Sequence, residues 1–203
     1  METGHWNQMA IDFMVMPISR YISGDFVTPA MRFAWKQGVP YSIFGPDGKR
    51  DLPPGLPFGG ASASARRARI VEKVLDGFRG LPRGISGHLW DERSEVEPSF
   101  HRVDADSYQV LVAHFAARPS RSFLGWRAAS KDKHCTASLI LPCDFRDPVD
   151  VSSPFERLAG AAKHALAELA RKKHPVDAVA AADTFSIALH DSIRLRLPLI
   201  VDW

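Results

Sequence analysis

Residues 10–18 read AIDFMVMPI, an apolar run that is interrupted by one charged residue. A run of this length and composition is typical of a buried β-strand. Thr28 and Pro29 then occupy the N-cap and first positions of a helix, and Gly38 can end that helix. Residues 39–44 are again apolar and predict a second strand. The chain therefore opens as strand, helix, strand.

Residues 45–60 contain nine Gly or Pro residues in sixteen positions. This composition predicts a long irregular loop. We expect residues 1–203 to form one domain, in which residues 1–60 are a candidate N-terminal subdomain that ends in this loop. A helix should follow, because apolar side chains recur at helical spacing. They are Ile70, Val71, Val74, Leu75 and Phe78, and the basic side is formed by Arg66, Arg67, Arg69 and Lys73.

The rest of the chain predicts a sheet and one further long helix. Residues 108–115 carry apolar side chains at both odd and even positions, as in a central strand that is buried on both faces. A helix is expected over 154–172, and residues 185–201 alternate as an extended segment with a bend. The fold class is therefore α+β, a mostly antiparallel sheet with helices packed on one face. The other expected strands are 85–90, 123–129 and 136–141, and the buried helix stripe is Phe155, Leu158, Ala162, Leu166 and Leu169.

Bulk composition limits the class of protein. No apolar run approaches the roughly 20 residues that cross a bilayer, and the N-terminus has no basic region followed by an apolar one. We therefore expect a cytoplasmic protein with no membrane partner. The net charge is +3, but the basic residues are scattered over several elements, which favours a solvated surface over nucleic-acid binding.

The two cysteines, Cys135 and Cys143, indicate a reducing compartment. In one extended strand they would lie about 27 Å apart, which is too far for a disulfide. Buried free thiols are the expected state. The sequence has no Cys-x-x-Cys pair, so we expect neither a metal site nor a cofactor.

Two short histidine motifs offer the one catalytic hypothesis. His134 and Thr136, and likewise His190 and Ser192, are two positions apart, so an extended strand would place each pair on one face. The pattern resembles the 2H phosphoesterase superfamily, although Asp191 replaces an apolar residue of that pattern. The resemblance implies metal-independent hydrolysis of cyclic phosphates or oligonucleotides, catalysed by these four residues. The same residues also fit the solvent-exposed face of an ordinary antiparallel sheet.

A second resemblance leads to the function that we favour. Residues 86–90, 136–142 and the helix 154–172 are together similar to small α+β immunity proteins of bacterial polymorphic toxins. This resemblance implies a non-enzymatic inhibitor that binds a protein partner, such as a cognate toxin. Whether the chain is an enzyme stays open, with "no" the favoured answer. The expected partner-binding residues combine an aromatic anchor with an acidic cluster, and the competing interpretation is a core Trp beside a solvated turn. They are Trp90, Asp91, Glu92, Glu95 and Glu97.

Overall fold

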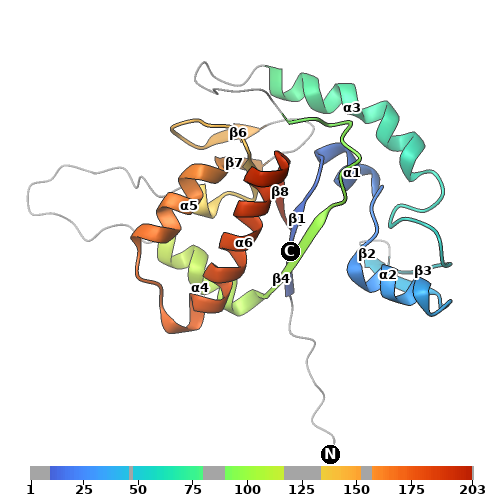
Figure 1. Ribbon diagram of the computed structural model, residues 1–203, viewed down its shortest axis with the longest axis horizontal. Coiled ribbons are helices and arrows are strands. Elements are labelled where there is room, and N and C mark those ends of the chain that lie inside the picture. The colour runs from blue at the N-terminus through green and yellow to red at the C-terminus, as the bar shows by residue number, and fades with distance from the viewer. Residues whose placement is uncertain (1–9, 46–47, 80–89, 117–133, 152–156, 203) are drawn as a thin grey trace, which may run out of the picture.

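A six-stranded mixed sheet forms the centre of the molecule (Figure 1). The computed structural model describes residues 10–45, 48–79, 90–116, 134–151 and 157–202. β5 and β7 run parallel, whereas all other neighbouring strands of this sheet pair antiparallel, so the predicted α+β class is confirmed. In spatial order the strands are β4 (Ser99–Asp104), β1 (Ala10–Val15), β8 (Leu199–Asp202), β5 (Leu139–Leu141), β7 (Arg157–Ala161) and β6 (Val149–Val151).

Three helices cover one face of this sheet. They are α4 (Ala105–Ala116), α5 (Ala162–Arg171) and α6 (Val179–Leu195), with the short 3-10 helices η1 (His134–Thr136) and η2 (Val176–Ala178). The side chains of β1 alternate between the two faces, and Phe13 points to these helices. Its ring lies 5.2 Å from the rings of both Tyr108 and Phe185. This aromatic cluster joins the sheet to α4 and α6.

The second face of the sheet is also covered. Met14 and Ile200 point to this side and share a buried cluster with Val74 and Phe78 of α3. The helices here are α1 (Ile18–Ser23) and α3 (Ala63–Arg79). Helices therefore pack on both faces of the sheet, whereas the sequence predicted a layer of helices on one face.

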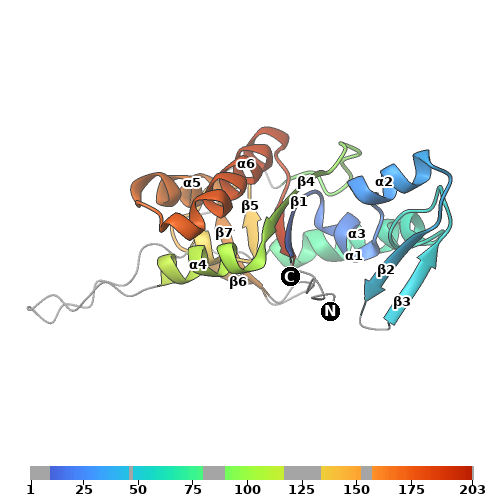
Figure 2. The same cartoon turned by 90° about the horizontal axis from the view of Figure 1, so that it is seen from below.

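A smaller unit lies at one end of the molecule (Figure 2). It consists of α2 (Pro29–Lys36) and the hairpin of β2 (Tyr41–Gly45) and β3 (Gly48–Leu52). The N–H of Met31 donates to Oγ1 of Thr28 across 3.2 Å, so the predicted N-cap is confirmed. Met31, Ile43 and Leu52 form a separate small buried cluster. Part of the predicted loop 45–60 is thus strand.

Two predicted strands are helices in the structure. Residues 108–115 belong to α4, where Tyr108, Leu111 and Phe115 are buried at helical spacing. The N–H of Ser107 donates to the carboxylate of Asp104, which caps this helix. Residues 185–195 belong to α6, and only 199–202 are extended. Residues 123–129 and 85–89 and Phe155 lie outside the described residues.

The predicted helix 154–172 is also wrong at its start. Residues 157–161 form β7, and the helix begins at Ala162. Leu158 is therefore a strand residue, whereas Ala162 and Leu169 of the predicted stripe are buried on α5. Leu166 is half-buried. Gly160 allows β7 to pack closely against η1, because a Cβ at this position would lie 2.8 Å from the carbonyl oxygen of His134.

Candidate functional site

His134 is a buried residue of η1, and both of its ring nitrogens contact the backbone. Nδ1 accepts a hydrogen bond from the N–H of Ala161 across 2.9 Å, so the proton sits on Nε2. Nε2 lies 3.1 Å from the carbonyl oxygen of Arg146, to which it donates. Burial lowers the pKa of His134, which keeps the ring neutral. This imidazole joins η1 to the start of α5. Thr136, its motif partner, is half-buried at the end of η1.

The second motif lies on α6 and not on a strand. In a helix, residues two positions apart point to opposite sides. His190 is accordingly exposed, whereas Ser192 is fully buried and donates its hydroxyl to the carbonyl oxygen of Leu197 across 2.7 Å. The two motifs therefore lie on a 3-10 helix and an α-helix, and neither lies on the extended strand in which its two residues would share a face. The phosphoesterase hypothesis loses the geometry on which it rested.

Asp191, which departs from that motif, is the centre of a polar cluster between β4 and α6. Oδ2 accepts a hydrogen bond from Oγ of Ser99 across 2.5 Å and lies 2.9 Å from Nε2 of His101. Oδ1 accepts a hydrogen bond from Arg194 across 2.6 Å. Ser99 and Asp191 contact the same ring nitrogen of His101, whereas a catalytic triad uses the two opposite nitrogens. The cluster therefore joins two elements and lacks the geometry of a proton relay.

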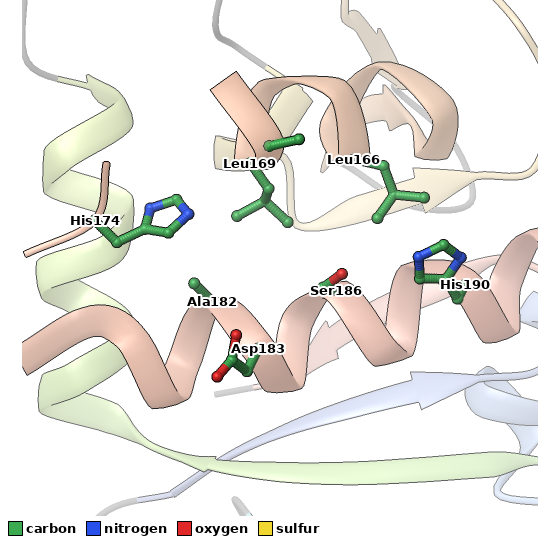
Figure 3. Close-up of a pocket in the computed structure, with 8 residues that line it drawn as sticks. Leu166, Leu169, His174, Ala182, Asp183, Ser186 and His190 are labelled. Carbon is green, nitrogen blue, oxygen red and sulfur yellow. The ribbon is translucent and has the colours of Figure 1, made fainter. Parts of the chain in front are cut away.

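An open groove of about 350 Å³ runs between α5 and α6 (Figure 3). Its apolar wall includes Leu166 and Leu169, and its polar side is one face of α6. Within the described ranges, Asp183, Ser186 and His190 form no hydrogen bond or ion pair. The remaining lining residues are Ala170, His174 and Ala182. Nδ1 of His174 is buried and has no hydrogen-bond partner in the part of the chain that the structure describes.

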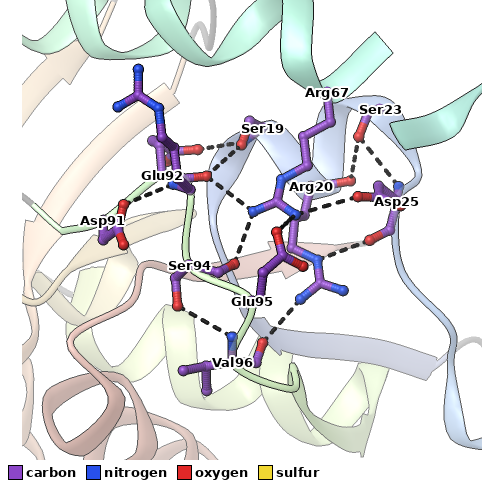
Figure 4. Close-up of polar contacts among 11 residues, drawn as sticks. Ser19, Arg20, Ser23, Asp25, Arg67, Asp91, Glu92, Ser94, Glu95 and Val96 are labelled. Atoms are coloured by element: carbon purple, nitrogen blue, oxygen red, sulfur yellow. Dashed lines mark hydrogen bonds and ion pairs between the residues drawn. The ribbon is translucent and has the colours of Figure 1, made fainter. Parts of the chain in front are cut away.

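The predicted anchor Trp90 and its neighbour Glu92 are interior residues. Trp90 is 4% exposed, and its ring packs edge-on against Phe78 with 4.9 Å between centroids. The carboxylate of Glu92 accepts a hydrogen bond from the N–H of Ser19 across 2.7 Å (Figure 4). It accepts another from the N–H of Ile18 across 2.9 Å. It also accepts the indole N–H of Trp90. These two predicted partner residues are therefore not at the surface, which agrees with the competing interpretation of a core Trp, and Glu92 stabilises the N-terminus of α1.

A buried arginine holds the segment that follows (Figure 4). The guanidinium of Arg67 donates to the carboxylate of Glu95 across 2.7 Å and to the carbonyl oxygens of Glu92 and Ser94 across 3.2 and 2.8 Å. It also contacts Asp25 across 3.4 Å. The sequence predicted Arg67 on the solvated side of its helix, whereas its side chain is 7% exposed. Residues 92–95 are thus fixed by backbone contacts although they form no helix or strand.

Three predicted partner residues remain at the surface. The side chains of Glu95 and Glu97 are 79% and 65% exposed, and Asp91 is also exposed. Glu97 contacts Arg32 of α2, and the next residue of that helix, Phe33, is 68% exposed. We define the 91–97 face as Asp91, Glu95, Glu97 and Phe33 together with Val96, which is 43% exposed. The sequence did not identify Phe33, because its exposure depends on how α2 packs.

No protein-family model, curated protein or solved structure matches this chain. Among the described residues, no group of three or more His, Cys, Asp or Glu side chains could hold a metal ion. The helices of these ranges are too short or too polar to cross a membrane.

Proposed function

We propose that this chain is a partner-binding protein that contacts a second protein through the 91–97 face. An immunity-type inhibitor of a bacterial toxin acts in this way. The observation that carries the proposal is a set of exposed carboxylates, one of which, Glu97, contacts Arg32, the residue before the exposed Phe33 of α2. Large exposed aromatic side chains supply much of the binding energy of protein interfaces.

The framework below the 91–97 face supports this proposal. Arg67 donates to the backbone carbonyls of Glu92 and Ser94 from the interior, and the carboxylate of Glu92 is bonded to the backbone of α1, so the outer side chains of the segment are held on a fixed path. A surface that is ordered before binding loses less conformational entropy when a partner arrives. The irregular segment therefore has the property of a preorganised recognition loop.

The chemistry of the face indicates the kind of partner. Asp91, Glu95 and Glu97 favour a partner surface that carries Lys or Arg, and Phe33 and Val96 require an apolar socket between those charges. Such a partner is met in the cytoplasm under our proposal, in keeping with the buried free thiols of Cys135 and Cys143.

Amide replacements remove the charge of this face while keeping the size of each side chain. The carboxylate of Asp91 accepts a hydrogen bond from the N–H of Arg93 across 2.9 Å, and an amide keeps that bond. The variant Asp91→Asn/Glu95→Gln/Glu97→Gln and the variant Phe33→Ala are tested by affinity capture from the native cells. Both variants should lose the stoichiometric partner that the wild type retains, with at least a tenfold weaker Kd for the purified pair.

Val176→Ala is the matched control, because Val176 is an 89% exposed apolar residue at η2. This variant should retain the partner. Circular dichroism confirms that each variant is folded. A partner that survives both changes on the 91–97 face, or the recovery of no partner by the wild type, contradicts the proposal.

A further inference from the structure

β4 is an outer strand of the six-stranded sheet (Figure 1). Among the described strands its one neighbour is β1, which pairs with it over its whole length. The other edge of β4 therefore has no strand beside it in the described part of the chain. Such an edge presents unpaired N–H and C=O groups, which an extended segment of another protein can bind.

The hydrogen-bond register of β1 shows which of its residues bond to β4. The N–H of Met16 donates to the carbonyl oxygen of Pro198 across 3.0 Å, at the end of the β1–β8 pair. Successive residues of a central antiparallel strand turn their backbone groups to alternate neighbours. Met14 therefore bonds to β8, whereas the backbone groups of Phe13 and Val15 point to β4.

The same alternation identifies the free groups of β4. The two β1 residues that point to β4 lie opposite His101 and Ser99, so these turn their backbone groups inward to β1. The N–H and C=O groups of Phe100 and Arg102 therefore point away from the sheet. They form no hydrogen bond in the part of the chain that the structure describes. In an extended strand they recur at a spacing of about 6.8 Å, which is the repeat that a partner strand offers.

An exposed aliphatic side chain lies next to this strand. Asp191 of α6 contacts both Ser99 and His101, which identifies the side of α6 that faces β4. Ile187 lies one helical turn earlier on the same side, and it is 55% exposed. A strand that was added to β4 would extend the sheet under α6 and would cover this side chain.

The 91–97 face adjoins the open edge at the start of β4. Glu97, the last residue of that face, is separated from the strand by Pro98 alone. Glu97 also contacts Arg32, so α2 lies at the same end of β4. A protein that is bound to the 91–97 face is therefore already placed at the beginning of the edge. This continuity favours that protein over a second copy of this chain as the occupant of the edge.

We propose that the partner of the 91–97 face adds an extended segment to β4, as a seventh strand of the sheet. Its backbone bonds to Phe100 and Arg102, and an apolar side chain of the segment packs on Ile187. The inference rests on the proposed function, because it names the binding mode of the same partner.

Amide hydrogen exchange, measured by NMR on the full chain, tests the register and the binding mode together. In the isolated chain, the N–H groups of Phe100 and Arg102 should exchange quickly, and those of His101 and Val103 should be protected by β1. In the complex with the purified protein that the wild type retains from the native cells, exchange at Phe100 and Arg102 should slow by about tenfold or more.

A proline at position 102 tests the backbone contact by affinity. Arg102→Pro removes an outward N–H and no bond between β4 and β1, and an edge strand tolerates proline in this orientation. Arg102→Ala is the matched control, because both variants lose the ion pair with Asp12 and only the proline variant loses the donor. The Kd for the purified partner should be about tenfold weaker for Arg102→Pro than for Arg102→Ala. Circular dichroism confirms that both variants are folded.

Ile187→Asp tests the edge without a change in the strand itself. A carboxylate at this position should weaken binding about tenfold, because it would be covered by the added segment. Val176→Asp is the control for a new charge at an exposed apolar position, and it should bind as the wild type does.

Three results would overturn the proposal. They are unchanged exchange at Phe100 and Arg102 in the complex, equal affinities of Arg102→Pro and Arg102→Ala together with an unaffected Ile187→Asp, and protection that rises with the concentration of the isolated chain. The last result would assign the edge to a second copy. If any of them is found while the amide variant of the 91–97 face still loses the partner, the proposed function remains intact. Recovery of no partner contradicts both proposals.

Discussion

The carboxylate of Glu92 accepts a hydrogen bond from the backbone N–H of Ser19 across 2.7 Å, although 73 positions separate the two residues. Oε1 accepts the N–H of Ile18, and the hydroxyl of Ser19 returns a bond to the carbonyl oxygen of Glu92. The N-cap residue of α1 is Pro17, which offers no side-chain acceptor. A distant carboxylate therefore satisfies the free N–H groups of this helix.

Glu92→Ala should strongly destabilise the fold. The change leaves the N–H groups of Ile18 and Ser19 and the indole of Trp90 without their acceptor in the interior. We expect a loss of about 3–5 kcal/mol in the free energy of unfolding, measured by urea denaturation. Glu95→Ala is the control, because its carboxylate is exposed, and it should cost clearly less. Equal losses in the two variants would show that the capping bonds contribute little.

Local signals explain which parts of the fold the sequence could predict. Thr28, Pro29 and Gly38 mark the ends of α2 by their own chemistry, so that helix was predicted correctly. Residues 108–115 are apolar at nearly every position, and such a run fits both a strand and a buried helix. In α6, Ala188 and Ser192 are buried beside Phe185 and Leu189, but their small side chains hide the helical period.

The surface of the 91–97 face was only partly predictable for a different reason. Charge and composition correctly place Asp91, Glu95 and Glu97 at the surface. The burial of Glu92 depends on the backbone of α1, and the burial of Arg67 depends on carbonyl groups of the segment itself. Contacts between residues so far apart in the chain leave no local pattern to read.

The two leucines of α5 should differ in their effect on stability. Leu169 is 5% exposed in the main core, whereas Leu166 is half-buried at the groove. Leu169→Ala should cost about 2–5 kcal/mol, and Leu166→Ala should cost roughly half as much. Chemical denaturation of the two variants measures the difference. If Leu166→Ala proved the more costly change, the groove would have to be closed in solution.

His134 and His190 should respond differently to the same substitution. His134→Ala leaves the N–H of Ala161 buried without an acceptor and should cost about 1–3 kcal/mol. His190→Ala removes an exposed side chain with no bond in the described residues and should change the stability of the monomer by less than about 0.5 kcal/mol. Urea denaturation gives both values.

The same variants test the phosphoesterase hypothesis. The wild type should cleave no 2′,3′-cyclic phosphate or cyclic oligonucleotide, because His134 and His190 do not share a strand face. Product is measured by chromatography with and without chelator. Cleavage by the wild type that is lost in a folded His190→Ala variant would restore the catalytic hypothesis.

Asp191 should make the stability of the protein depend on acid pH. Burial opposes ionisation of its carboxylate, but hydrogen bonds from Ser99, Arg194 and His101 outweigh this and lower its pKa from 3.8 to about 2. Because the folded pKa lies below the unfolded one, ionised Asp191 stabilises the fold at pH values above about 4. That contribution is lost as the pH falls through about 2.

The free energy of unfolding of the wild type and of Asp191→Asn should therefore converge between pH 5 and pH 2. Asp150→Asn, which removes an exposed carboxylate on β6, is the control and should show no such convergence. A constant difference between the wild type and Asp191→Asn over this range would mean that the cluster between β4 and α6 does not depend on the charge of Asp191.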